Sequence, residues 1–227
     1  MIKIDENTKG VAMFDGAQWF LAGMSMALSV QLSQPVAAAV PLGKAVQTAQ
    51  TNSNEAAKKV FEEAEKLNQQ GTADSKRKAI VKWEEALKLY REAGDRLREA
   101  ATLHNIGAIY SELGEQQKAL EYYSQSLPLS QAVGDRSWEA LTLYCMAYAK
   151  RDQNNLTEAL NDIESSLKII ENLRTNIASP ELRSSYLATV QEYYEFYIDL
   201  LMQLHKTNPN SGYDIKASEA SERAKTP

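Results

Sequence analysis

The chain has 227 residues, of which 44% are hydrophobic, and a formal net charge of −5. This length and composition allow either one compact core or an elongated array of small units. The 25 Lys and Arg residues are scattered among 30 Asp and Glu residues, so we expect no basic surface for nucleic acid. One cysteine, Cys145, excludes an internal disulfide and a cysteine-based metal site. With only His104 and His205, the sequence predicts no metal, no cofactor and no catalytic residue.

The first fifty-three residues differ in composition from the rest. Residues 19–30 (WFLAGMSMALSV) form an uncharged, largely apolar run that is too short to span a bilayer. Ala37 and Ala39 follow it with the small-x-small pattern of a signal-peptidase site, but the preceding acids oppose the usual positive charge. Two alternatives stay open: a cleaved export signal, or a loosely packed tail on a cytoplasmic protein. Residues 40–53 are predicted to be a polar linker.

From Asn54 onward, apolar residues recur at helical spacing and the pattern repeats every forty residues. The small, large and aliphatic positions that recur are Ala79, Ala119 and Ala159; Trp83, Tyr123 and Ile163; and Leu87, Leu127 and Leu167. A fixed period of this length predicts a stack of similar helical units.

The clearest repeated segments are GDRLREAATL, from Gly94, and GDRSWEALTL, from Gly134. Each glycine follows a helical stretch and suits the left-handed residue that ends a helix. The aspartate that comes next can cap a new helix, and the glutamate of the motif falls near its first turn. The motif therefore predicts a joint at which one helix ends and another begins.

A second break inside each unit predicts a hairpin of two antiparallel helices. It falls within residues 111–120 and 151–160, and within the longer stretch 69–80 of the first unit. The expected array fills residues 54–227, with hairpins at about 54–95, 96–135 and 136–175 and an elongated, incomplete one at 179–227. In the last hairpin, Pro180 is expected at the first helical position. The predicted fold is an all-α solenoid.

These letters resemble the tetratricopeptide repeat (TPR) in its variant of about forty residues. Signature positions are Val60, Ala64, Leu67, Ala79, Trp83 and Ala86; then Leu103, Ile106, Gly107, Tyr110, Ala119, Tyr123 and Ser126; then Leu143, Met146, Ala147, Lys150, Ala159, Ile163 and Ser166. Lys150 departs from the usual aromatic residue. The resemblance implies a right-handed superhelix of hairpins, a non-enzymatic scaffold that binds a protein or peptide in its concave groove.

Residues 54–225 also resemble the TPR region of cyanobacterial CHAT-domain proteins, most clearly in the segments LRTNIASPELRSSYLATVQEYYEFYIDLLMQLH and ASEASERAK. In that family a caspase-like domain with a His and Cys dyad follows the repeats. The resemblance implies an alternative function, as the regulatory TPR portion of a thiol protease, with a CHAT-type catalytic domain as partner. Neither Cys145 nor His205 lies in a matching catalytic motif, so no activity is carried over.

By analogy with TPR proteins, the first helix of each hairpin would line the groove. Asn105 matches a position at which many TPRs bind a peptide backbone. The carboxylate clamp, with which some TPRs bind chaperone tails, also needs Lys or Arg at positions that here hold Phe61, Glu65, Leu141 and Cys145, so that ligand is not expected. For each groove residue, ordinary surface is the alternative. For the aromatic residues Tyr186, Tyr193, Tyr194, Phe196 and Tyr197, core packing is favoured over peptide binding. The candidate groove residues are His104, Asn105, Ala108, Ser111, Glu112, Tyr144, Tyr148 and Arg151.

Overall fold

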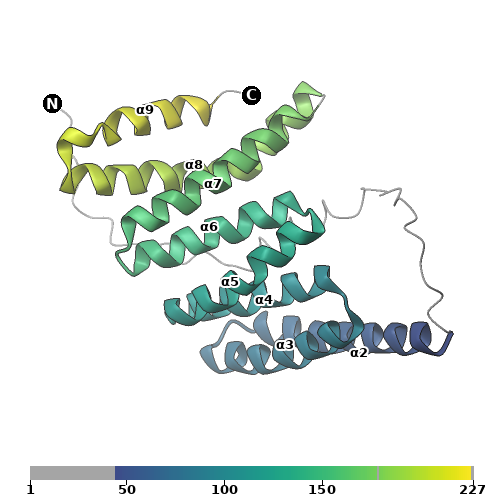
Figure 1. Ribbon diagram of the computed structural model, residues 1–227. Coiled ribbons are helices and arrows are strands. Elements are labelled where there is room, and N and C mark those ends of the chain that lie inside the picture. Colours follow the sequence, from purple (N-terminus) through teal and green to yellow (C-terminus); the bar gives the residue numbers. More distant parts are fainter. Residues whose placement is uncertain (1–43, 178, 226–227) are drawn as a thin grey trace. The chain divides into compact units, whose positions relative to one another are not determined.

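The computed structural model describes residues 44–177 and 179–225, and all regular structure in that part of the chain is helical (Figure 1). The elements are α2 (Lys44–Asn68), α3 (Ala73–Ala93), α4 (Arg96–Glu112), α5 (Gln116–Val133), α6 (Arg136–Asp152), α7 (Leu156–Thr175), α8 (Pro180–Thr207), the 3₁₀ helix η1 (Pro209–Ser211) and α9 (Tyr213–Arg223). The expected export signal lies outside the described residues. The first helix begins at Lys44, within the segment expected to be a linker, and α8 begins at Pro180 as predicted.

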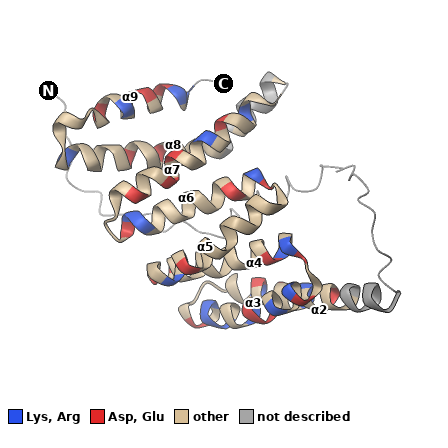
Figure 2. Cartoon of the chain, viewed as in Figure 1, with Lys and Arg blue, Asp and Glu red and all other residues tan. Residues whose placement is uncertain are grey.

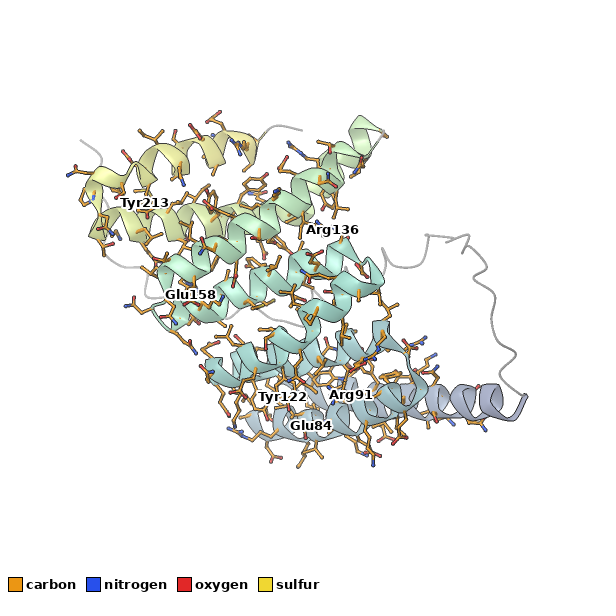
Figure 3. The ribbon with its side chains drawn as sticks, viewed as in Figure 1. Glu84, Arg91, Tyr122, Arg136, Glu158 and Tyr213 are labelled. Atoms are coloured by element: carbon orange, nitrogen blue, oxygen red, sulfur yellow. The ribbon has the colours of Figure 1, made fainter. Side chains whose placement is uncertain are left out.

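The helices pack as hairpins that are stacked in chain order, from α2 to α9 (Figure 1). The hairpins are α2/α3, α4/α5, α6/α7 and α8/α9, and each contacts the next mainly through neighbouring helices, α3 on α4, α5 on α6 and α7 on α8. The second helices of adjacent hairpins are also linked, by a hydrogen bond from the Tyr122 hydroxyl on α5 to Glu84 Oε1 on α3 at 2.8 Å (Figure 3). Contact with adjacent units is the defining feature of a solenoid. The predicted all-α solenoid is confirmed for the described residues.

The repeated GDR motif forms the joints between hairpins. Gly94 and Gly134 end their helices in the left-handed region, with φ of 73° and 74°. Asp95 Oδ1 then accepts the Arg98 backbone N–H at 3.0 Å, and Asp135 Oδ1 accepts that of Trp138 at 2.9 Å. A left-handed residue at a helix end suits glycine, and an aspartate at the N-cap satisfies an N–H that the helix leaves unpaired. Both roles predicted for the motif are confirmed.

A buried glutamate completes each joint. Glu99 is 4% exposed and accepts hydrogen bonds from Arg91 Nε at 2.8 Å and from Arg96 Nη1 at 3.0 Å. Glu139 is 5% exposed and accepts from Gln131 Nε2 at 3.0 Å and from Arg136. A buried carboxylate is tolerated because these donors and the nearby helix N-terminus offset its loss of water.

The cores of hairpins α4/α5 and α6/α7 each contain a small residue and a large one at corresponding positions. A Cβ added at Gly107 would lie 2.8 Å from Tyr123 Cε1 and 2.9 Å from Cδ1, so only glycine leaves room for that ring. Forty residues on, Ala147 and Ile163 are both fully buried. The close approach of the two helices that the sequence predicts at Gly107 is confirmed.

Hydroxyl groups also link the helices at the same interval. Ser126 donates to the Ala100 carbonyl at 2.8 Å, and Ser166 donates to the Ala140 carbonyl at 2.7 Å. Both serines are buried, so each hydrogen bond satisfies polar groups that water cannot reach.

Charged residues of both signs are interspersed along the described helices (Figure 2). Among these helices, none is both long and apolar enough to cross a membrane.

Candidate functional site

The candidate groove residues lie on the first helices of two adjacent hairpins, α4 and α6. The structure divides them into buried and partly accessible side chains. His104 and Asn105 are buried; Ala108, Ser111, Glu112, Tyr144, Tyr148 and Arg151 keep some exposure. We call the surface formed by these six residues the first-helix face.

His104 lies between helices rather than on the first-helix face. Its ring centroid is 5.2 Å from that of Tyr123 and 5.0 Å from that of Trp138, and Nδ1 is 3.2 Å from Thr142 Oγ1. Burial lowers the pKa of His104 to about 4, so the ring is neutral at pH 7. These contacts account for His104 by packing, and its role in binding a ligand stays a prediction.

Asn105 is 2% exposed, and its side-chain oxygen Oδ1 has no hydrogen-bond partner among the described residues. An unpaired buried acceptor costs about 1–3 kcal/mol. Its position on α4, between Ala101 and Ala108, places it on the same side of the helix as partly exposed residues. The structure thus contains a buried acceptor without a donor at the position that the sequence analysis selected.

The α6 part of the first-helix face is joined to α8 through aromatic rings. The ring of Tyr144 lies 4.4 Å from that of Tyr193 and 5.4 Å from that of Phe196, and the rings of Tyr148 and Phe196 stack at 5.8 Å. The Arg151 guanidinium carbon lies 4.2 Å from the Tyr148 ring centroid and 4.8 Å from that of Phe196. We call these five residues the aromatic platform.

Tyr193 and Phe196 are buried, so core packing is confirmed for these members of the α8 aromatic cluster. In the sequence, that cluster and the groove residues are separate features. Nothing in the chain order shows that Phe196 contacts Tyr148, because the contact depends on how α8 lies beside α6. The helical spacing of Tyr144, Tyr148 and Arg151 was the one signal available beforehand.

Polar residues at the end of α4, the beginning of α5 and the end of α6 form a hydrogen-bonded network beside the platform. Ser111 Oγ donates to Gln116 Oε1 at 3.0 Å, and Gln116 Nε2 donates to Asp152 Oδ2 at 3.2 Å. Asp152 also pairs with Arg151, whose Nη2 is 3.1 Å from its Oδ1. The network holds the guanidinium of Arg151 from one side while the rings support it from the other.

Glu112 is also paired, in this case with a residue of the preceding hairpin. Its Oε2 lies 2.8 Å from Lys76 Nζ, and about a third of its side chain, 30%, is exposed. Because both charges are partly accessible, this pair contributes little to stability and presents a polar edge to solvent.

Cys145 and His205 are not brought together as a reactive pair by any contact in the structure. Burial raises the pKa of the Cys145 thiol to about 12, although a hydrogen bond with Tyr123 acts in the opposite direction. His205 instead lies against α9, with Nδ1 3.7 Å from Asp214 Oδ1. A thiol with such a high pKa is protonated at neutral pH and a poor nucleophile. Within the described ranges, no group of three or more His, Cys, Asp and Glu is arranged to hold a metal ion.

Two surface hollows are lined by residues other than the candidate groove residues. One, of about 730 Å³, lies between α5, α6 and α7 and is lined in part by Gln131, Glu139 and Ile169. The other, of about 470 Å³, lies between the α4–α5 turn and the end of α6. None of the eight candidate groove residues lines either hollow.

Residues 74–132 match the sequence family described as "Tetratricopeptide repeat". That segment spans α3, α4 and α5, and TPR repeats are therefore supported there. A comparison with curated proteins gave no match.

Several solved structures are similar at low identity. The TPR-like repeats of a putative kinesin light chain from Podosopora anserina are 16% identical, over 75% of this chain and 86% of that one, with a TM-score of 0.45. The apo form of RapI is 20% identical, over 80% of this chain and 59% of that one, with a TM-score of 0.43. BtubC from P. vanneervenii is 19% identical, over 82% and 91% of the two chains, with a TM-score of 0.37. These comparisons do not bear on the resemblance to CHAT-domain proteins.

Proposed function

We propose that this chain is a non-enzymatic scaffold that binds a segment of a partner protein along the first-helix face. The observation that carries the proposal is the aromatic platform, in which Arg151 lies over the rings of Tyr148 and Phe196. Tyrosine and arginine are the residue types enriched at binding hot spots. TPR repeats, which residues 74–132 match, generally mediate protein–protein interactions.

The platform is preorganised for binding. Asp152 and the two rings already fix the Arg151 guanidinium, so little side-chain entropy would be lost when a ligand docks. The side chain of Arg151 is 21% exposed, and its remaining N–H groups are donors for backbone carbonyls of an extended segment. The rings beside it supply apolar contact area for the segment's side chains.

Asn105 provides a second contact in this proposal. A backbone N–H of the ligand would satisfy the unpaired Oδ1 of Asn105. Because the residue is 2% exposed, such a ligand must first displace the side chains that cover it. We therefore expect Asn105 to add affinity after the platform has been engaged.

The test is a quantitative pull-down with the full chain as bait, compared with Tyr148→Ala, Arg151→Ala and Asn105→Ala. Lys88→Ala is the matched control, because Lys88 is exposed on α3 and outside the first-helix face. Proteins retained by the wild type and the control should be lost with the Tyr148 and Arg151 variants and reduced with the Asn105 variant. Circular dichroism must show the same helical signal for all baits. Equal recovery of every protein by all five baits would contradict the proposal.

The resemblance of residues 54–225 to the TPR region of CHAT-domain proteins supports a second candidate function. In this version the partner is a CHAT-type catalytic domain, and the chain regulates a thiol protease. The test is to translate the DNA beyond the codon for Pro227 and to look for a further helix followed by a His and Cys pair. Unrelated sequence at that place would rule this version out and leave the first proposal standing.

A further inference from the structure

The hollow between α5, α6 and α7 shares no residue with the first-helix face, so it belongs to a different surface. Its base contains Leu143 and Ile169, both buried, and its polar lining includes Gln131, Glu139 and Ser165. Its volume of about 730 Å³ lies within the range of roughly 300–1,000 Å³ that is usual for ligand sites. The hollow is therefore an open depression in the surface with a mixed polar and apolar lining.

The hollow has an equivalent position in the preceding joint, forty residues earlier, between α3, α4 and α5. In that joint the position is occupied by an arginine side chain. Arg91, labelled in Figure 3, occupies the position there that Gln131 occupies here. Its Nε donates to Glu99 Oε1 at 2.8 Å, and its Nη2 lies 3.4 Å from Gln125 Oε1. One guanidinium therefore connects the buried glutamate of α4 to α5.

No such bridge is formed at the hollow. Gln131 Nε2 donates to Glu139 Oε1, but the shorter side chain ends there. Ser165 takes the place of Gln125, and its hydroxyl donates to the Asn161 carbonyl of its own helix at 2.8 Å. The side chains that line the hollow are thus the counterparts of those that surround the Arg91 guanidinium in the preceding joint.

We propose that this hollow binds an arginine side chain from a segment of a partner protein, with the guanidinium in the place that Arg91 takes in the preceding joint. Glu139 is 5% exposed and accepts from Gln131 and Arg136, so the incoming guanidinium must displace the Gln131 amide from Oε1, the contact that Arg91 Nε makes with Glu99. A carboxylate has about four acceptor positions, so Glu139 can then accept the N–H groups of the guanidinium. The Ser165 hydroxyl is a second acceptor. The aliphatic part of the arginine packs on Leu143 and Ile169.

The cations around the hollow do not prevent this binding. Arg136 lies beside Glu139 as Arg96 lies beside Glu99, and the Arg91 guanidinium is accommodated next to Arg96. Lys168 adds a positive charge to the lining, while the charge of Glu171 is already paired with Arg174. Arginine is favoured over lysine because its planar fork can reach Glu139 and Ser165 together, whereas an ammonium is a single point of contact.

The experiment uses the full chain and backbone amide NMR, with the peptides acetyl-Gly-Arg-Gly-amide and acetyl-Gly-Lys-Gly-amide as probes. The arginine peptide should shift amides of residues 136–143 and 165–172, and bind at least about tenfold more tightly than the lysine peptide. In Gln131→Arg/Ser165→Gln, which rebuilds the Arg91–Gln125 pair inside the hollow, affinity should fall at least about tenfold. The Lys88→Ala control should bind as the wild type does.

A gain-of-binding variant provides the converse test. Arg91→Gln/Gln125→Ser should create a second hollow, and the arginine peptide should then also shift amides near Glu99 and Gln125. Thermal melts confirm that each variant is folded. Absence of shifts at the hollow, equal affinity for the two peptides, or unchanged affinity in Gln131→Arg/Ser165→Gln would each overturn the inference.

Discussion

The hairpins α4/α5 and α6/α7 begin with the same capping motif but differ in the residues that pack between their helices. Each begins with a capping aspartate and a buried glutamate, and each has a serine that donates to a carbonyl of the first helix. Between the helices, Gly107 and Tyr123 in one are replaced by Ala147 and Ile163 in the other. The joint needs specific polar groups at fixed positions, whereas the interior needs only a constant total volume.

The same contrast decides what the first helices present to solvent. His104 on α4 is covered by Trp138, while its counterpart Tyr144 on α6 meets Tyr193 and stays partly exposed. Ala108 on α4 corresponds to Tyr148 of the aromatic platform. The residues that recur in each repeat determine the backbone arrangement. The residues that differ between repeats form the surface on which binding is proposed.

The largest difference that we expect between the two hairpins is in their response to acid. Burial lowers the pKa of His104 from 6.5 to about 4, so the folded state favours the neutral ring. The stabilisation is complete above pH 6.5 and is lost as the pH falls from 6.5 towards 4, by roughly 3 kcal/mol. Tyr144, the counterpart in α6, has no such titration in this range.

Urea denaturation of the wild type and of His104→Phe at pH 7 and pH 4 measures this effect. The difference between the two proteins isolates His104 from the carboxylates that also titrate. If both proteins lost the same stability between these pH values, the ring would not be buried as described.

The next effect is on stability and concerns Gly107, the residue by which the interior of α4/α5 differs most from that of α6/α7. Gly107→Ala places a Cβ within 2.9 Å of two ring carbons of Tyr123, and we expect a loss of about 2 kcal/mol in the free energy of unfolding. Gly107→Leu should cost more. Adding Tyr123→Ile to Gly107→Ala reproduces the Ala147 and Ile163 pair, so the double variant should be more stable than the sum of the single changes predicts. Additive changes in a denaturation cycle would show that the two hairpins do not share one packing scheme.

A smaller effect is expected from the caps, which are the part the hairpins share. Asp95→Ala and Asp135→Ala should each cost about 1 kcal/mol, because both lose a cap hydrogen bond, and Asp95→Ala should cost slightly more, because Asp95 also pairs with Arg98. Asn155→Ala is the matched control, since Asn155 precedes α7 without forming a side-chain cap. If thermal melts showed a loss of stability for one aspartate variant and none for the other, the two caps would not be equivalent.

The smallest expected change in the free energy of unfolding comes from giving the two joints the same side chains. Gln131→Arg/Ser165→Gln should raise the free energy of unfolding by about 0.5 kcal/mol, because the added contacts are partly exposed to solvent. Arg91→Gln should lower it, since the bridge to Gln125 is lost and the buried Glu99 loses a charged donor. Denaturation curves that move in the opposite directions would mean that Arg91 does not support its joint.

Much of the fold could be predicted because its signals are local. Gly94 and Gly134 end helices through their own backbone angles, and Asp95 and Asp135 cap the helices that follow within three residues. The forty-residue interval then fixes which helices form a hairpin. The beginning of α2 at Lys44 was missed, because the polar sequence before Asn54 lacks an apolar stripe to indicate a helix.

The candidate site was less predictable because exposure depends on the next hairpin. Helical position alone placed His104, Asn105 and Tyr148 on one face. Trp138 of the following helix buries His104, and Phe196 of α8 provides the second ring beneath Arg151. The hollow beside Gln131 was not foreseen, because it results from side chains that are too short to meet across two helices.

The sequence by itself determined where the helices on either side of each GDR motif end and begin and how often the unit repeats, because capping and left-handed turns act over a few residues. Only the tertiary structure decided which side of each first helix stays accessible and which joint remains unfilled. Those features depend on contacts such as that of Tyr148 with Phe196, between residues 48 positions apart in the chain. No local pattern specifies such a pair, since it forms only when whole hairpins are stacked.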